Sequence, residues 1–228
     1  MSLAVKRATT QIPLVFLITF DPIDIGLVSN LAHPGGNVTG VTSLSSLEIF
    51  AKRLQLLREL VPSATRVAVL LSTEQTRSDQ ARETLATAAK SLGIELHDVQ
   101  VQAPSDLEFA IHGAKDQGSQ AIYVWPSGFT FSFAKQISDA ANVIFLPTIH
   151  SFREGALGGG LLAYAADMKE EVRRGAAYVD KILRGTPPGR LPVEQLSKYE
   201  LFINLTTAKA LGLNVPDKLL ALADEVVE

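Results

Sequence analysis

The sequence predicts an α/β fold with a mostly parallel sheet, and two repeated observations support this. Short, continuously apolar runs, typical of strands buried on both faces, recur along the chain. Between them lie longer segments in which apolar residues recur every three or four positions, as on one face of a helix. Strands that alternate with helices in this way form βαβ units, whose strands run parallel.

The expected strands follow one another from the N-terminus at fairly even intervals. In chain order they cover residues 14–19, 38–41, 66–71, 95–100, 121–125, 143–146, 160–164 and 200–205. The helix after the second strand shows a stripe of apolar residues at helical spacing, namely Leu47, Phe50, Leu54, Leu57 and Leu60.

Three later helices have boundaries that match helix-capping preferences. Helices over 80–92 and 106–117 end near Gly93 and Gly118, and glycine is the preferred residue just past a helix C-terminus. The helix over 168–183 stops before Gly185 and carries its apolar positions at Val172, Ala176, Val179 and Leu183. A Pro/Gly-rich connector follows it at 186–192, which marks a surface loop or a crossing between domains.

Composition narrows the possible classes of function. The chain of 228 residues corresponds to about one and a half domains, with 46% hydrophobic and 20% charged residues as in a packed globular protein. A net charge of −3 argues against nucleic acid or an anionic membrane as the main partner. The absence of cysteine excludes disulfides, thiolate metal sites and cysteine nucleophiles. No apolar run is long enough for a membrane helix, and no signal peptide is visible.

Catalytic and cofactor motifs are not found in the sequence. There is no nucleophile elbow, no Walker loop and no dinucleotide-binding glycine motif after a strand. The four histidines are scattered without the spacing of metal ligands. We therefore expect neither an enzyme nor a cofactor or metal site.

Candidate binding residues follow from the rule that ligands of open α/β sheets gather at the carboxyl ends of the strands. This rule selects Asp21, Thr42, Ser72, His150 and Tyr164, each of which lies at or just past the end of an expected strand. For Asp21 and Ser72 an alternative is helix capping, a role that both residue types commonly fill.

An aromatic segment follows the strand at 121–125. Trp125 is the only tryptophan, and Phe129 and Phe131 follow it in an expected loop that begins near Ser127. Aromatic faces with a few polar groups are typical of small-molecule pockets. A role in the hydrophobic core is the alternative for the rings, and Ser127, like Ser72, could instead be a cap.

Four stretches of the sequence resemble the tryptophan/tyrosine-uptake-like group of ABC transporter substrate-binding proteins. The four stretches are 21–28, 33–41, 52–62 and 198–212, of which Pro34-Gly35-Gly36-Asn37-Val38-Thr39-Gly40 is fairly specific. The resemblance as a whole covers essentially the entire chain. The resemblance implies a type I periplasmic-binding-protein fold, in which two doubly wound lobes joined by crossover strands close over a ligand.

The resemblance also implies a division into lobes. Residues 1–42 and 168–192 would form a remnant of the first lobe, and residues 43–167 and 193–228 the second. The link at 42–46 and the Pro-rich connector would lie near interlobe crossings. Family members usually begin with an export signal and about three further βα units. We therefore expect a homodimer or an exchanged partner to complete the short first lobe.

In functional terms, the resemblance implies a non-enzymatic solute-binding component that delivers its ligand to an ABC permease, in the periplasm or otherwise exported. The segment after Trp125 offers no acidic group for an ammonium, which favours an apolar or aromatic compound, such as an aromatic acid, over a plain amino acid. An intracellular small-molecule sensor of the same fold is the alternative, and an α/β enzyme is a more distant one.

Overall fold

The computed structural model describes residues 2–19, 21–43, 46–72 and 79–228. The chain divides into two units, each formed by two separate stretches of sequence. Unit 1 comprises Met1–Ser46 and Ala166–Lys198, and unit 2 comprises Leu47–Ala165 and Tyr199–Glu228. Each unit contains its own sheet packed against helices, which confirms the predicted α/β class.

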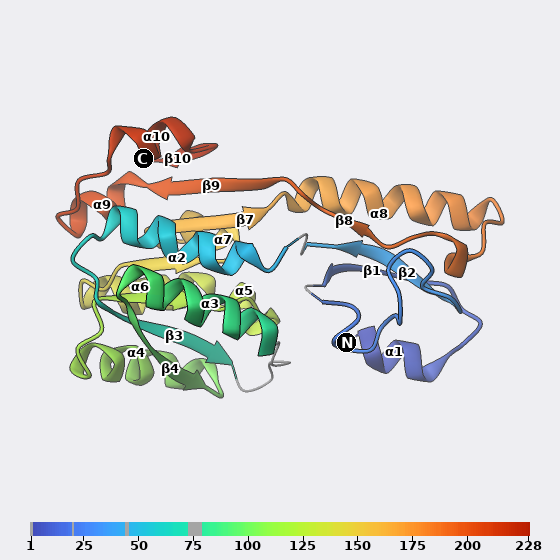
Figure 1. Cartoon of the computed structure of the whole chain (residues 1–228), viewed down its shortest axis with the longest axis horizontal. Helices are drawn as coiled ribbons and strands as arrows, with labels where there is room; N and C mark the ends of the chain where they lie inside the picture. The colour runs from blue at the N-terminus through green and yellow to red at the C-terminus, as the bar shows by residue number, and fades with distance from the viewer. Residues whose placement is uncertain (1, 20, 44–45, 73–78) are drawn as a thin grey trace. The chain divides into compact units, whose positions relative to one another are not determined.

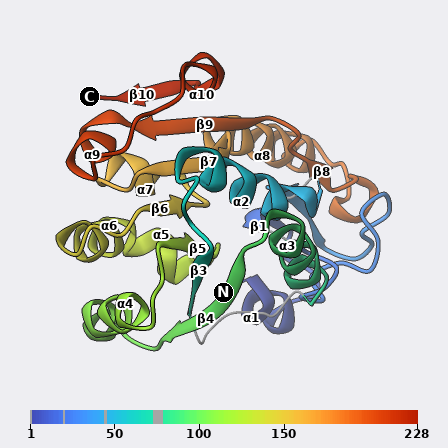
Figure 2. The same cartoon turned by 60° about the vertical axis from the view of Figure 1, so that its left-hand side comes forward.

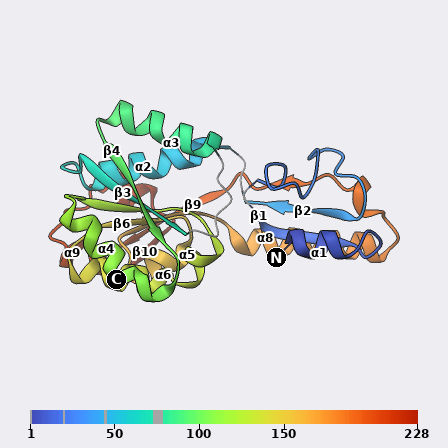
Figure 3. The same cartoon turned by 90° about the horizontal axis from the view of Figure 1, so that it is seen from below.

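Unit 1 is built on a three-stranded parallel sheet in the order β1-β2-β8. Figure 3 shows helices α1 and α8 on the same side of β1 and β2. A small core that includes Phe16, Leu27 and Val38 fills the interior. The described elements are α1 (Ser2–Ala8), β1 (Leu14–Thr19), β2 (Val38–Thr42), α8 (Met168–Leu183), the 3-10 turn η2 (Pro188–Arg190) and β8 (Glu194–Gln195).

The units differ from the expected lobes at residues 43–46, 166–167 and 193–198, which all belong to unit 1. Residues 193–198 lie in unit 1, because β8 pairs with β2 through Val41 and Glu194. The Pro-rich connector at 186–192 also lies within unit 1 rather than at a passage between units. The link at 42–46 does lead from unit 1 to unit 2, although its residues 44–45 lie outside the described residues.

Unit 2 is built on a seven-stranded sheet in the order β10-β9-β7-β6-β5-β3-β4. Its strands are β3 (Arg66–Ser72), β4 (Glu95–Val101), β5 (Ala121–Val124), β6 (Thr148–His150), β7 (Leu162–Ala166), β9 (Tyr199–Asn204) and β10 (Glu225–Val227). Strands β4, β3, β5, β6 and β7 are parallel. Strand β9 runs opposite to β7 (Figure 1). Asn204 N, at the end of β9, donates to the carbonyl of Leu161 just before β7, and the ring of Tyr199, at the start of β9, lies beside Tyr164 of β7.

Helices cover both faces of the unit 2 sheet, as Figure 2 shows for α2 and α3 on one face and α4 and α6 on the other. Side chains of β3 alternate between these layers, so Ala68 and Leu70 join the core beneath α4 and α6. The helices are α2 (Glu48–Leu60), α3 (Asp79–Leu92), η1 (Pro104–Asp106), α4 (Leu107–Asp116), α5 (Gly128–Ser132), α6 (Ala134–Val143), α7 (Arg153–Leu157), α9 (Leu205–Ala210) and α10 (Asp217–Leu222).

One strand expectation is wrong. Residues 143–146 form no strand: α6 ends at Val143, and the neighbouring strand β6 is Thr148–His150. Val143 and Phe145 are 73% and 66% exposed, and Phe145 has a φ of 56°. The apolar run is therefore a helix end followed by a turn, in which Leu146 alone enters the core completely.

Candidate functional site

Ser72 ends strand β3 in unit 2 and is 5% exposed. Its Oγ has no hydrogen-bond partner among the residues that the structure describes. A buried hydroxyl without a partner costs free energy, so native structures usually satisfy it with protein, water or a ligand. Helix α5 packs against β3. Ser72 is therefore a buried hydroxyl without a partner among the described residues, at the carboxyl end of a parallel strand, where ligands of such sheets bind.

Trp125 follows β5 on the face of the sheet that α2 and α3 cover. Its ring centroid lies 4.7 Å from that of Phe50 in α2 and 6.3 Å from that of Tyr123. The Arg82 guanidinium carbon of α3 lies 5.9 Å from its ring centroid, within cation–π range. Trp125 is 4% exposed, so most of its surface belongs to the core.

A cavity of about 360 Å³ opens beside Trp125, between α3 and strands β3 and β4. Apolar side chains line most of it: Val69, Leu85, Ala86, Leu96 and Trp125. Glu83, Arg82 and Asp98 supply the polar part, and Arg82 Nη2 lies 2.6 Å from Asp98 Oδ2. This combination of an aromatic wall with a cation and an anion is complementary to a small aromatic molecule that carries charged groups.

The segment expected as an aromatic loop contains the short helix α5. Ser127 is its N-cap, because Ser127 Oγ accepts a hydrogen bond from Thr130 N at 3.0 Å. Thr130 Oγ1 in turn donates to the carbonyl of Trp125 at 2.7 Å. The structure therefore ties the end of β5 to α5 through a capping network.

The two phenylalanines of α5 point to different neighbours. Phe129 is half-buried against the core beneath α4 and α6, with its ring centroid 4.9 Å from that of Phe133. Phe131 makes an edge-to-face contact with Phe152 at 5.1 Å. Neither ring is among the lining residues of the cavity beside Trp125.

His150 lies in the interior of unit 2, 2% exposed. Its Nε2 is 3.2 Å from both Ser138 Oγ and Thr148 Oγ1. A Cβ at Gly155 would lie 2.0 Å from His150 Cγ, so glycine is needed there for the ring to fit. Burial lowers the pKa of His150 to about 3, which keeps the ring neutral at physiological pH. His150 is therefore a core residue whose Nε2 lies within hydrogen-bond distance of two hydroxyl groups.

Tyr164 lies beside Tyr199, with ring centroids 5.6 Å apart, and burial is the main cause that raises its pKa. Its carbonyl accepts a hydrogen bond at 2.8 Å from Nε of Arg53, a residue that the sequence analysis did not select. Arg53 is 1% exposed and its Nη1 has no partner among the described residues. The stripe on α2 predicts burial of leucines, but it does not reveal a buried arginine among them.

In unit 1, Asp21 and Thr42 lie near the carboxyl ends of β1 and β2. Asp21 Oδ1 accepts hydrogen bonds from Ile23 N and Asp24 N, so this side chain caps a turn and not a helix. Thr42 is buried, and its Oγ1 donates to the carbonyl of Thr19. Both side chains therefore hold local backbone in place.

Glu171 joins the ends of β1 and β2, although the sequence analysis did not select it. This carboxylate of α8 is fully buried, and it accepts hydrogen bonds from Ile18 N at 2.6 Å and Ser43 Oγ at 2.8 Å. Ile18 has a φ of 55° at a register shift of β1. Burial raises the pKa of Glu171, and the two hydrogen bonds oppose that increase. The structure thus builds the end of β1 around a buried acid.

Neither a cluster of metal-ligating side chains nor a membrane-spanning helix occurs in the described ranges. No group of three or more His, Cys, Asp or Glu side chains there could hold a metal ion. None of the helices in this part of the chain is both long and apolar enough to span a membrane.

Comparisons with known proteins agree with this architecture. A curated tyrosine-binding protein of Clostridioides difficile is 29% identical over 211 residues, and the chain spans 60% of that protein's length. A conserved domain protein of Vibrio cholerae has a crystal structure with a TM-score of 0.90 at 28% identity. An ABC domain of Streptococcus pneumonia in complex with L-Trp has the same TM-score at 23% identity. Each solved structure matches 99% of this chain, which covers 75% of the solved one.

The family model for ABC transporter substrate binding proteins matches residues 1–227. This match extends over both units and over all four stretches that carry the resemblance in the sequence. The two mostly parallel sheets are consistent with it. The chain therefore belongs to the family of ABC transporter substrate-binding proteins.

Proposed function

We propose that this chain is the solute-binding part of an ABC importer and that its ligand is a small aromatic compound with charged groups, such as an aromatic amino acid or aromatic acid. The observation that carries the proposal is the cavity beside Trp125, which joins an aromatic wall to Arg82 and Asp98. The tyrosine-binding relative supports the same class of ligand.

The cavity chemistry indicates how such a ligand would be held. Val69, Leu96 and Trp125 would contact the ring, because apolar and aromatic surfaces favour burial of a flat apolar group. Arg82 would pair with a carboxylate, and Asp98 with an ammonium where the ligand has one. Both charged side chains are about one-third exposed, so ligand groups can compete for them.

Four further predictions from the sequence are part of this proposal: a role for Ser72, the partner, the cellular location and the division into lobes. The Ser72 hydroxyl, which has no partner among the described residues, offers a further hydrogen bond for a ligand at the end of β3. We also propose that an ABC permease is the partner, that the protein works outside the cytoplasm, and that it binds its ligand without chemical turnover. Residues 1–42 with 168–192 and residues 43–167 with 193–228 remain our proposed lobes, apart from residues 193–198, which β8 joins to unit 1.

Isothermal titration with phenylalanine, tyrosine, 4-hydroxyphenylacetate and tyramine tests the ligand class and the need for each charged group. We expect the natural chain to bind in a saturable manner. Arg82→Met should weaken binding of the compounds that carry a carboxylate at least tenfold, and Asp98→Asn should do the same for those that carry an ammonium group. The control is Glu95→Gln, which removes another acid of β4 whose partner Arg66 lies on β3. No heat from any of the four compounds with folded protein would contradict the proposal.

A further inference from the structure

The chain passes between the two units at three places. The first passage follows Ser46, the second follows Ala165 and the third follows Lys198. On the unit 2 side, the first passage leads into α2, the second comes from β7 and the third leads into β9. Because backbone that is held by contacts is less free to bend, contacts among these three elements limit where the passages can move.

Arg53 connects these elements inside unit 2. From the second turn of α2, its Nε donates to the carbonyl of Tyr164 in β7 at 2.8 Å, two residues before the chain leaves unit 2. The Tyr164 ring in turn lies beside that of Tyr199, the first residue after the third passage, with ring centroids 5.6 Å apart and an interplanar angle of 31°. Arg53, Tyr164 and Tyr199 therefore form one cluster that touches all three elements next to the passages.

The same arginine also contacts the support of the cavity wall. Its guanidinium carbon lies 5.7 Å from the ring centroid of Phe50, and the Phe50 ring lies 4.7 Å from that of Trp125, which lines the cavity. Tyr123 Oη donates to the carbonyl of Phe50 at 3.3 Å, which fixes this turn of α2 to β5. Successive contacts therefore join Trp125 to Phe50, Phe50 to Arg53 and Arg53 to the strand that leaves unit 2.

Core packing alone does not account for an arginine at this position. Arg53 is 1% exposed, and its Nη1 has no partner among the described residues. Burial of a guanidinium is costly, and an apolar side chain of similar volume often stabilises a core at least as well. The directional bond to the Tyr164 carbonyl is what the arginine adds here.

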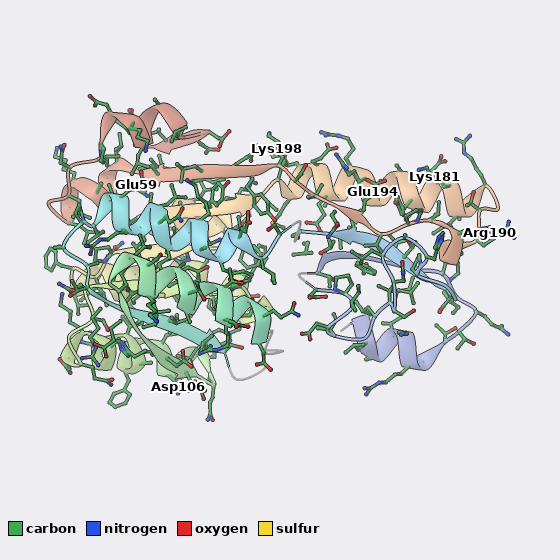
Figure 4. The ribbon with its side chains drawn as sticks, in the orientation of Figure 1. Glu59, Asp106, Lys181, Arg190, Glu194 and Lys198 are labelled. Carbon is green, nitrogen blue, oxygen red and sulfur yellow. The ribbon has the colours of Figure 1, made fainter. Side chains whose placement is uncertain are left out.

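A second pair joins two of the passages on the unit 1 side. Asp167 N donates to the carbonyl of Lys198 at 3.4 Å, and Lys198 Nζ lies 3.5 Å from Asp167 Oδ2. Lys198, labelled in Figure 4, is the last residue of unit 1 before the third passage. Ala165 and Ala166 alone separate Tyr164 from Asp167, so the second passage is held at both ends of a two-residue segment.

We propose that Arg53 is a positioning residue for ligand binding, which fixes the unit 2 ends of the passages and couples them to the Trp125 wall of the cavity. Where it concerns the ligand, the inference rests on the proposed function; where it concerns the passages, it rests on the contacts of Arg53. Without Arg53 the passages vary more in direction. The arrangement that binds ligand is then a smaller fraction of the molecules.

The spread of distances between the units, measured without ligand, is the first test. Lys181→Cys on α8 and Phe109→Cys on α4 place one spin label on each unit at exposed helix positions, and the natural chain has no cysteine. Electron paramagnetic resonance then gives the distribution of the label–label distance. We expect Arg53→Met to broaden this distribution relative to the otherwise natural chain.

Arg58→Met is the matched control for this measurement. Arg58 lies in the last turn of the same helix and also donates to a backbone carbonyl, that of Ala64, at the end of α2 away from the passages. Its replacement should leave the distribution unchanged. An unchanged distribution in Arg53→Met, or equal broadening in Arg58→Met, overturns the proposal.

Arg53→Lys decides the question if the methionine variant does not fold. Lysine keeps the positive charge but lacks the Nε–H group that reaches the Tyr164 carbonyl, so the distribution should again be broader. Thermal melting of each variant establishes that it is folded. A distribution as narrow as that of the natural chain in folded Arg53→Lys overturns the role of the bond between Arg53 and Tyr164.

Calorimetric titration with tyrosine tests the coupling to the cavity. Arg53→Met should raise the Kd for tyrosine about fivefold, although Arg53 is not among the residues that line the cavity. A broadened distribution with an unchanged Kd overturns the coupling to Trp125. If the natural chain binds none of the four compounds named above, the proposed function fails, and the distance distribution still decides whether Arg53 fixes the passages.

Discussion

The two units stabilise the carboxyl ends of their strands in different ways. Unit 2 surrounds the end of β6 with neutral groups, where His150 shares hydrogen bonds with Ser138 and Thr148. Unit 1 surrounds the end of β1 with the carboxylate of Glu171. Burial favours the neutral form of both groups. A histidine is neutral above its pKa, whereas a carboxylic acid is neutral below its pKa. The two units should therefore respond oppositely to pH.

The largest expected effect is the loss of unit 2 stability in acid. The folded pKa of His150 is about 3 and its ordinary value is 6.5, so the unfolded state binds more protons between these limits. The free energy of unfolding should fall by about 4 kcal/mol as the pH drops from 6.5 to 3, at about 1.4 kcal/mol for each pKa unit. Urea unfolding followed by the fluorescence of Trp125 measures it.

The variant His150→Gln provides the matched comparison. It should be less stable at neutral pH, because the new side chain fits less well between Gly155 and Gly160. Its stability should nevertheless change much less between pH 6.5 and 3. Equal pH dependence in both proteins would exclude His150 as the cause.

Removing the acid of unit 1 should have the next largest effect. Glu171→Ala leaves Ile18 N and Ser43 Oγ without this acceptor, and we expect a loss of about 3 kcal/mol. Hydrogen exchange measured by mass spectrometry should show faster exchange in peptides of β1 and β2. Peptides of β3 and β5 are the internal control, and uniform acceleration in all four would contradict a contribution local to unit 1.

The pH dependence of unit 1 should have the opposite sign to that of unit 2. The pKa of Glu171 is raised above its ordinary 4.5, so the folded state holds the proton more tightly than the unfolded state. Stability is therefore greatest below pH 4.5 and decreases as the pH rises through the raised pKa. The effect is smaller than that of His150, because the two hydrogen bonds favour the ionised form.

Glu171→Gln should remove this slope from the exchange of β1 and β2, because the amide does not titrate. The measurement is the exchange rate of those peptides at pH 4.5 and above, corrected for intrinsic rates. A slope that persists in the variant would show that another group titrates in unit 1.

Replacing either of two buried serines of unit 2 by alanine should change stability least among these variants, and the two replacements should differ from each other. Ser138 Oγ contacts His150 and bonds the carbonyls of Ala134 and Gly155, so Ser138→Ala should cost about 1–2 kcal/mol. Ser72 Oγ has no partner among the described residues, so Ser72→Ala should not lower stability. Thermal melting measures both, and an equal loss for the two would contradict the assigned hydrogen bonding.

The sequence predicts the fold class well because strands buried on both faces produce apolar runs that periodicity can detect. The helix ends are also predictable, since Gly93 and Gly185 have φ values of 65° and 99° just past α3 and α8. The pattern of apolar residues predicts the wrong element or the wrong buried face where apolar residues are exposed. The run at 143–146 looks like a strand, and the apolar positions of α8 do not face its own sheet, because Glu171 and Gly175 do.

The site is less predictable than the fold for a related reason. The position of a residue at a strand end does not determine whether its side chain has hydrogen-bond partners within the protein. Ser72 and His150 both end strands, yet His150 Nε2 lies within hydrogen-bond distance of two hydroxyls while Ser72 Oγ has no partner among the described residues. Arg82 and Asp98 approach Trp125 only through the packing of α3 on β4, which no local pattern in the sequence reveals.

The bond between Ile18 and Glu171 has a consequence for folding during synthesis. These residues are 153 positions apart in the chain, and β8 lies further still toward the C-terminus. At about 5–20 residues per second, a ribosome exposes β1 and β2 roughly 8–30 s before the acid that completes them is made. Early strands with free edges and no partner are prone to aggregate. The growing chain should therefore depend on holding these two strands in a non-aggregated state until α8 emerges.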